Sequence, residues 1–597
     1  MSDVISEREL RGTGSHAQSV SDQADENGMH QRRAIVLGLN AATVAALVAA
    51  MMGLMSYGGI TALEWAMLLP YAMTLPWLSI GLWNSLIGFW LDRTLSDAPG
   101  HVTPALRRVT GREPVASRVA VVMALRNEDA DAALQRLRSI ARDLSATPWG
   151  GRFDFHILSD SDHADIALRE ETLFAMLRKE PFGARVFYRR REENPGYKAG
   201  NIAEFVGRCH ADYDYFLPLD ADSSMSAAAI LRLVRVMQKS PEIGMLQGLV
   251  VGHASRTFFT RAFQFGMRQG MRSFTLGSAW WQGDCGPSWG HNLLIRMQPF
   301  HAQCMLPKLS GQGPLSGWVL SHDQLEAALM RRAGFEVRVV AEEDESFEEN
   351  PPSVVDFIRR ELRWCNGNMQ YLRLLGLPGL KPVSRVQLLL AIQMYLAAPA
   401  WILFVLMGAA LAAAPAQVEA VPLSAGLGFF ALIMTLNLMP KLMGLGQVLF
   451  DRARSESYGG RGKVVVGGAA EILFSMLIAP AVAVALARFL AGLFVGQRIG
   501  WSAQQRSRER LDWDEATHVL WPQTVLGVGL TLWIGYAAPW ALWIAGPMLF
   551  ALVFAIPIAV ISAAPALGRW STETGLFDIP EEVRPARTLR SDAMHVA

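Results

Sequence analysis

Apolar residues gather in long runs near both ends of the chain. Near the beginning, Ala34–Ser56 and Ala62–Trp90 are each long enough to cross a bilayer core, which takes about 20 apolar residues. The polar residues 1–33 predict a disordered cytoplasmic tail. Basic residues flank the pair of runs, but the turn between the runs has none. We therefore predict two membrane helices over 34–92 with both outer ends in the cytoplasm.

A second set of apolar runs predicts a membrane bundle over 385–566. Four runs predict full spans: Val386–Ala413, Pro422–Met439, Thr524–Ala545 and Pro547–Pro565. The run Val464–Val495 differs, because it has Pro480 at its middle and basic loops on both sides. A single crossing would leave one of these loops outside. We predict a re-entrant or hairpin segment there, six full spans in all, and a cytoplasmic tail over 567–597.

Residues 100–380, between the two bundles, have the pattern of a cytoplasmic α/β domain. Short apolar runs typical of buried strands alternate with helical periodicity. The predicted strands are Val119–Leu125, Phe153–Ser159, Ala184–Tyr188, Tyr213–Leu219 and Ile243–Val250, and the predicted helices include Ala130–Asp143 and His163–Lys179. This alternation predicts a mostly parallel sheet that binds ligands at the carboxyl ends of its strands.

Composition supports a membrane protein with a sizeable soluble part. Hydrophobic residues make up 51% of the chain and charged residues 18%. The net charge of +1 gives no basic surplus that would indicate nucleic acid as a partner. Four cysteines lie far apart without a C-x-x-C pair, so neither a disulfide framework nor a zinc site is indicated. The chain shows no internal repeat, which weakens the interpretation as a transporter.

Carboxylates follow two of the predicted strands. Asp220 and Asp222 come directly after Tyr213–Leu219, and Asp160 and Asp162 follow another strand. Hard oxygen ligands of this kind suit Mg²⁺ or Mn²⁺ bridging a diphosphate. A single Asp-x-Asp is equally compatible with a solvated turn. The additional carboxylates at an equivalent strand end favour a binding crevice.

Other polar groups belong to the same predicted crevice. Asn127 and Glu128 follow the first strand, and Lys198 opens a helix after a Pro-Gly turn. An ammonium at a helix N-terminus is a favourable place for an anion. The polar groups at three strand ends and one helix start therefore meet in one crevice. Together they suit a nucleotide diphosphate.

Two segments further along the chain are candidates for catalysis. Asp323 begins an amphipathic helix and is either a helix cap or a general base. Arg363 and Trp364 precede the second bundle, where they suit a departing diphosphate and a sugar ring. A juxtamembrane basic and aromatic belt is the alternative explanation for this pair.

Together these residues resemble the processive family-2 glycosyltransferases, which include cellulose, chitin and hyaluronan synthases. The counterparts of the family motifs are Asp160, Asp220 with Asp222, Asp323, and Arg360-x-x-Arg363-Trp364. Arg360 stands where the synthases have Gln, and Ser321-His322 stands where they have a Thr/Glu pair. These departures, with Gly286–Asn292 and Leu320–Gly334, are similar to the glucosyltransferase H family that makes osmoregulated periplasmic glucans.

The resemblance implies a GT-A-like nucleotide-sugar-binding fold and an inverting polymerisation of glucose from UDP-glucose, mainly in β-1,2 linkage, at the bacterial inner membrane. Asn127, Glu128, Asp160, Asp162 and Lys198 would hold the nucleotide. The same resemblance assigns the diphosphate and metal to Asp220 and Asp222, the diphosphate or acceptor to Arg360 and Arg363, the acceptor to Trp289, His291, Asn292 and Trp364, and the base to Asp323.

The resemblance also implies the partners. These are the growing glucan, the lipid bilayer, acyl carrier protein and periplasmic glucan-processing proteins, with Mg²⁺ or Mn²⁺ as cofactor. Two alternatives stay open from the sequence. One is a synthase of another β-linked polymer such as cellulose or chitin, and the other is a membrane transporter with a nucleotide-binding domain.

Overall fold

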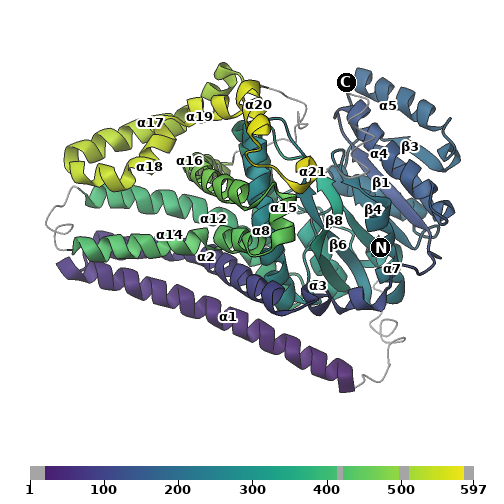
Figure 1. The fold of residues 1–597 in the computed structure, drawn as a ribbon, viewed down its shortest axis with the longest axis horizontal. Coiled ribbons are helices and arrows are strands. Elements are labelled where there is room, and N and C mark those ends of the chain that lie inside the picture. Colours follow the sequence, from purple (N-terminus) through teal and green to yellow (C-terminus); the bar gives the residue numbers. More distant parts are fainter. Residues whose placement is uncertain (1–19, 413–420, 497–509, 584–597) are drawn as a thin grey trace.

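The computed structural model describes residues 20–412, 421–496 and 510–583. An α/β domain lies at one end and a bundle of long helices at the other (Figure 1). The described residues contain five helices long and apolar enough to cross a membrane, or six if one bent pair counts as a span. The predicted class, an α/β domain joined to a polytopic helical membrane part, is confirmed.

The α/β domain is built on one eight-stranded sheet with the order β3-β2-β1-β4-β7-β6-β8-β5. The strands are β1 (Val119–Leu125), β2 (Phe153–Ser159), β3 (Val186–Arg190), β4 (Tyr215–Leu219), β5 (Ser224–Met225), β6 (Ile243–Gly252), β7 (Leu293–Arg296) and β8 (Glu336–Glu348). β1 to β4 are parallel to one another, whereas β7 runs antiparallel between β4 and β6. The carboxyl ends of β1 to β4 therefore meet at one edge of the sheet.

Helices cover both faces of this sheet. Alternate residues of β1 point to opposite faces: Val121 packs in a core with α4 (Ala130–Ser145) and α7 (Ala227–Lys239), and Val122 packs in the other core with α6 (Tyr197–Cys209) and α10 (Asp323–Arg332). α5 (Ala164–Leu177) lies over β2 and β3 (Figure 1). Burial on both faces explains why the strands are near-continuous apolar runs.

Three strands were not predicted. β7 has four residues, β5 has two, and β8 contains four consecutive acidic residues, Glu342–Glu345. None of them has the continuous apolar run that identifies a buried strand. The predicted start of the third strand at Ala184 is also displaced, because a 3₁₀ turn over Gly183–Arg185 precedes β3.

The helical bundle contains α1 (Val20–Met55), α2 (Ala62–Thr94), α12 (Pro382–Leu411), α14 (Leu423–Leu449), α16 (Arg461–Phe494), α17 (Trp513–Ala537), α18 (Leu542–Val553) and α19 (Ala555–Ser562). The break predicted between Ala545 and Pro547 is wrong. The chain turns at Pro539–Ala541 instead, and Pro547 lies inside α18.

The predicted hairpin at 464–495 is also wrong, because α16 is one continuous helix of 34 residues with Pro480 inside it. Its beginning packs at Val464 with Phe265 and Phe577, and its end packs at Leu490 in the core shared with α10 and the start of α12. The chain therefore does not reverse within 464–495.

Both predicted tails are partly ordered helices. α1 begins at Val20, and Arg33 forms an ion pair with Asp284 and donates to the carbonyl of Gln282, which anchors this polar stretch on the α/β domain. At the other end, α20 (Pro565–Thr574) and α21 (Pro580–Val583) fold back onto the protein. The rest of both tails, and the loops at 413–420 and 497–509, lie outside the described residues.

Two helices join the α/β domain to the bundle. α8 (Phe258–Gln282) stands across the direction of the bundle helices (Figure 1). It approaches α2 so closely that a Cβ on Gly88 or Gly277 would collide with the facing backbone at Ser273 or Asn84. α11 (Val354–Gln370) leads directly toward α12.

Candidate active site

A cavity of about 460 Å³ lies at the carboxyl edge of the sheet. Residues at the ends of β1, β2, β4 and β6 line it together with residues of α11 and α12. Eleven of the fourteen sequence-predicted residues line it. Those lining it are Glu128, Asp160, Lys198, Asp220, Asp222, Trp289, His291, Asp323, Arg360, Arg363 and Trp364. The cavity therefore reaches from the strand ends to the membrane bundle.

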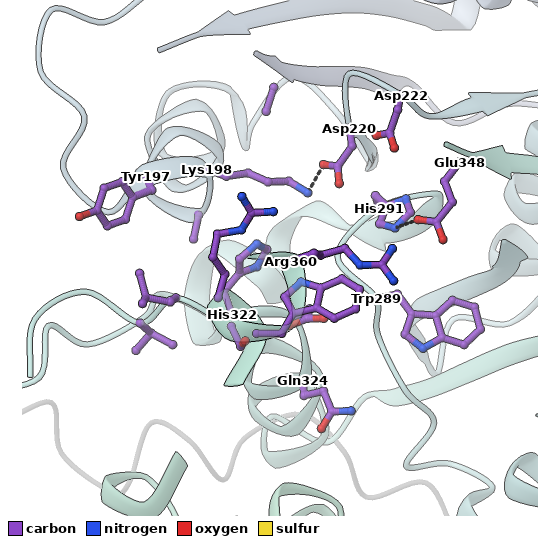
Figure 2. A pocket seen from close by; sticks show the side chains of 18 of the residues that line it. Tyr197, Lys198, Asp220, Asp222, Trp289, His291, His322, Gln324, Glu348 and Arg360 are labelled. Carbon is purple, nitrogen blue, oxygen red and sulfur yellow. Dashed lines mark hydrogen bonds and ion pairs between the residues drawn. The ribbon is translucent and has the colours of Figure 1, made fainter. Parts of the chain in front are cut away.

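Asp220 and Asp222 follow β4 and both line the cavity. Asp220 forms an ion pair with Lys198, whose ammonium also donates to the carbonyl of Gly290 at 3.1 Å (Figure 2). Asp222 is 4% exposed and accepts the backbone N–H of Glu349 at 3.2 Å. This pairing fixes the direction of both carboxylates.

The two carboxylates fit a hard divalent ion. Mg²⁺ characteristically takes one or two carboxylates and completes its shell with phosphate and water oxygens. Within the described residues no group of three or more His, Cys, Asp or Glu side chains is arranged to hold a metal. The donor set at Asp220 and Asp222 suits an ion that also binds a diphosphate, and it does not suit a closed structural metal site.

Asp160 is held by buried partners. Arg191 donates to both of its carboxylate oxygens at 2.7 Å, and Asn201 donates to one of them at 2.8 Å. Burial raises the pKa of Asp160, and the Arg191 guanidinium opposes that shift. Asp160 thus organises the floor of the cavity, with most of its hydrogen-bonding capacity already used by the protein.

Asn127 and Asp162 do not line the cavity. The Asn127 side chain bonds to the carboxylate of Asp162 and accepts the backbone N–H groups of Asp162 and His163 at 3.0 and 3.1 Å. Asn127 has a φ of 53°, a left-handed conformation that asparagine tolerates better than most residues. The pair joins the ends of β1 and β2 beside the cavity.

Asp323 is the first residue of α10 and lines the cavity. The loop before it is seated on neighbouring helices: the Tyr371 hydroxyl donates to the carbonyl of Ser321 at 3.0 Å, and Gln370 accepts the N–H of Leu320 at 2.9 Å. Gly367 of α11 leaves room for Ser321, since a Cβ there would collide with it. Asp323 makes no side-chain cap bond to α10 within the described contacts, and its carboxylate lies at the cavity wall.

Arg360, Arg363 and Trp364 lie on α11 and line the cavity together. The Arg360 guanidinium lies 4.5 Å from the ring centre of Trp364 and 5.3 Å from that of Phe357, within cation–π range. Trp364 keeps 47% of its surface exposed. An exposed indole backed by a guanidinium is a suitable platform for a sugar ring.

The predicted acceptor segment divides in two. Trp289 and His291 line the cavity, and His291 lies 3.4 Å from the carboxylate of Glu348. Asn292 is fully buried, and its amide donates to Ser346 and to the carbonyl of Phe347. Asn292 therefore stabilises the sheet and does not reach the cavity.

Sequence reasoning missed several residues of the cavity wall: Arg126, Tyr197, Met271, His322, Gln324, Glu348, Glu349, Asn368, Tyr371, Met394 and Tyr395. His322 had a signal, because it replaces a residue of a known motif next to Asp323. Glu348 and Glu349 come at the end of β8, a strand that the pattern did not reveal. Met394 and Tyr395 belong to α12 and had no signal beyond membrane hydropathy.

Comparison with known proteins indicates the family. The family described as glycosyl transferase family 2 matches residues 120–303, and the glycosyl transferase family group 2 matches residues 215–437. The matches contain the strands, Asp220, Asp222, Asp323 and α11. Residues 120–437 are thus similar to the family-2 glycosyltransferases. The GT-A-like α/β fold expected from the motifs is therefore confirmed for the catalytic domain.

The resemblance to the glucosyltransferase H family is also confirmed. The chain is 35% identical over 547 residues to glucans biosynthesis glucosyltransferase H of Pseudomonas aeruginosa (strain LESB58), with 89% of this chain and 63% of that protein covered. The protein of the same name from Pseudomonas putida (strain F1) is 35% identical over 550 residues, with 89% and 64% covered. This glycosyltransferase thus spans less than two thirds of the length of these relatives.

Among solved structures, the chain is similar to the mannosyltransferase PcManGT from Pyrobaculum calidifontis in complex with GDP-Man and Mn²⁺. The identity is 16%, the TM-score is 0.37, and the match covers 62% of this chain and 99% of that one. This level of similarity carries no conclusion about ligands.

Proposed function

We propose that this glycosyltransferase is an inverting, processive enzyme that polymerises glucose from UDP-glucose into a β-glucan and passes it across the bacterial inner membrane. One observation carries the proposal: a single cavity brings Asp220, Asp222 and Asp323 together with α11 and Tyr395 of α12. Donor-type carboxylates, a candidate base and a membrane helix thus share one space. The similarity to glucosyltransferase H supports a glucan with mainly β-1,2 linkage.

The donor binds at the strand ends. Asp220 and Asp222 hold Mg²⁺ or Mn²⁺, which supplies charge neutralisation to the departing diphosphate when it is bound. Lys198 and Arg363 add positive charge at the same wall. Glu128 and the Asp160–Arg191 pair lie toward the end of the cavity that suits the nucleoside.

Asp323 acts as the general base. Its carboxylate takes the proton of an acceptor hydroxyl while the acceptor oxygen forms a bond to the anomeric carbon. The bond from that carbon to the diphosphate oxygen breaks, and the pair of electrons leaves with the diphosphate. One displacement inverts the α-linked donor to a β-linked product without a covalent glycosyl-enzyme.

The acceptor lies along α11. Trp364 and Trp289 offer ring faces to sugar residues, and Arg360 and His291 offer hydrogen-bond donors beside them. From there the cavity continues to Met394 and Tyr395 of α12, which gives a growing chain a direction toward the bundle.

Orientation and partners follow the same proposal. The α/β domain and both termini lie in the cytoplasm, where UDP-glucose is made available to the strand ends. Acyl carrier protein and periplasmic glucan-processing proteins are proposed as partners on the resemblance alone.

The test is the product. Purified full-length protein in lipid nanodiscs receives radiolabelled UDP-glucose and Mg²⁺, and the polymer is digested with glucanases of known linkage specificity. We expect labelled polymer that a β-1,2-specific glucanase degrades and that cellulase and chitinase leave intact. A polymer degraded by cellulase alone would assign the enzyme to cellulose synthesis, and no incorporation of glucose would overturn the proposal.

A further inference from the structure

The residue before the candidate base is a histidine with a buried acidic partner. His322 Nδ1 lies 3.1 Å from a carboxylate oxygen of Glu326, four residues later on α10. The two side chains are 12% and 8% exposed. His322 lines the cavity, but Glu326 does not. The contact between His322 Nδ1 and Glu326 is an ion pair and not a well-aligned hydrogen bond, and the Cε1–Nε2 edge of the ring lies beside Gly290.

That edge lies at the corner where the donor carboxylates are held. The position of a Cβ on Gly290 would be 3.4 Å from His322 Cε1 and 3.8 Å from His322 Nε2. The carbonyl of Gly290 in turn accepts the Lys198 ammonium, which pairs with Asp220. Figure 2 shows Lys198, Asp220 and His322 around this part of the cavity. Gly290 has a φ of 77° and no side chain, which keeps the corner open.

We propose that His322, paired with Glu326, is a positioning residue that donates from Nε2–H to a phosphate oxygen of the nucleoside diphosphate. The proposal rests on the proposed function, since it assigns the ligand of the same site. A buried cation beside Lys198 has no benefit for folding alone, because two like charges at one corner repel each other. A bound diphosphate is negatively charged, so it attracts both cations and offsets the repulsion between them.

The charges around the imidazole support its protonation. Burial by itself lowers the pKa of His322, and the Lys198 ammonium from α6 acts in the same direction. The carboxylates of Glu326 and Asp323, both on α10, outweigh them, so the pKa of His322 is raised above its ordinary value. Arg363 of α11 is the further cation on the cavity wall. The imidazolium form of His322 is therefore favoured relative to a free histidine, and it is lost as the pH rises through the raised pKa.

The experiment measures UDP binding to the purified full-length protein by calorimetry with Mg²⁺, from pH 5.5 to 8.5. In the wild type we expect affinity to fall at alkaline pH. Glu326→Gln removes the group that raises the pKa, so the fall should move at least one pH unit lower, with affinity near that of the wild type at pH 5.5. His322→Gln should bind UDP about tenfold more weakly at pH 6.5 and lose this pH dependence.

Arg332→Gln is the matched control, because it removes a charge from the other end of α10 outside the cavity; its profile should follow that of the wild type. An unchanged pH profile in Glu326→Gln, or unchanged UDP affinity in a folded His322→Gln, would overturn the inference. Slower glucose transfer with unchanged UDP affinity would also overturn it, and would indicate that His322 acts on Asp323 and not on the diphosphate. If the wild type binds UDP but transfers no glucose, the proposed function fails while the binding result still decides this inference.

Discussion

At the scale of single residues, the cavity wall combines positions that the sequence revealed with others that it hid. Asp220, Asp222, Asp160 and Asp323 were identifiable because each follows a strand or opens a helix with a recognisable pattern. Asn292 was also predicted from its motif to face the site. Its side chain is instead buried, and its amide donates to the hydroxyl of Ser346. Spacing along the chain specifies which residues are near the edge of the sheet, but packing decides which of them face the cavity.

Arg360 is the residue whose substitution best separates an active-site role from a membrane-belt role. Arg360→Gln removes a guanidinium that stacks on Trp364, an interaction worth about 0.5–2 kcal/mol. We expect glucose transfer at saturating UDP-glucose to fall several-fold while the protein stays folded. Arg359→Gln is the matched control, because Arg359 is 46% exposed and pairs with Glu515 outside the cavity. Equal rates of glucose transfer for the two variants would indicate that Arg360 belongs to the juxtamembrane basic and aromatic belt.

At the scale of elements, the sequence predicted most strands and membrane helices but not their paths. A long apolar run indicates a helix, and α16 is such a helix. Whether it crosses the bilayer or lies along its surface depends on contacts with distant segments, such as the pair between Glu471 and Lys441 of α14. Pro480 does not interrupt α16, because proline is tolerated in a membrane helix that is packed against other helices. Pro480 is buried, and Gln523 of α17 donates to the carbonyl of the next residue, Ala481, at 3.2 Å.

Basic residues are frequent in the loops on both sides of α16, so we predict that both loops are cytoplasmic. A cysteine introduced at Ser507 should therefore resist a membrane-impermeant thiol reagent added to intact cells. A cysteine at Gln417, in the loop after α12, should react, since that loop is predicted to face the periplasm. Both cysteines are placed in a variant without the four native ones. Labelling at 507 as strong as at 417 would show that α16 crosses the membrane.

At the scale of the whole molecule, ion pairs fasten the end of the described chain to the junction between its two parts. Arg261 of α8 is fully buried, pairs with Glu582, and lies 3.1 Å from Asp578. Arg268 lies about two turns further along α8. It pairs with Glu581 and with Glu343 of β8. The sequence alone gave no indication of this arrangement, because the acidic residues near 580 have the pattern of a solvated tail.

Loss of the buried cation should destabilise the junction. Arg261→Met leaves Glu582 without its counter-charge and Asp578 with Lys463 alone. Breaking a buried pair in this way costs about 3–5 kcal/mol. We expect a clearly lower apparent Tm of the detergent-purified protein by nanoscale differential scanning fluorimetry. Arg452→Met, which removes an exposed partner of Glu456, should leave the Tm nearly unchanged. Similar Tm values for the two variants would argue against a structural role for the C-terminal segment.

The central claim is that Asp323 is the base of a glucosyl transfer and takes no part in holding the donor. The most direct measurement compares Asp323→Asn with the wild type in the same preparation, for UDP-glucose binding and for polymer formation. We expect nearly unchanged binding and a rate lower by about 10²–10⁴. Asp222→Ala should instead weaken the metal-dependent binding of UDP-glucose. An Asp323→Asn variant that keeps half of the wild-type rate would contradict the assignment.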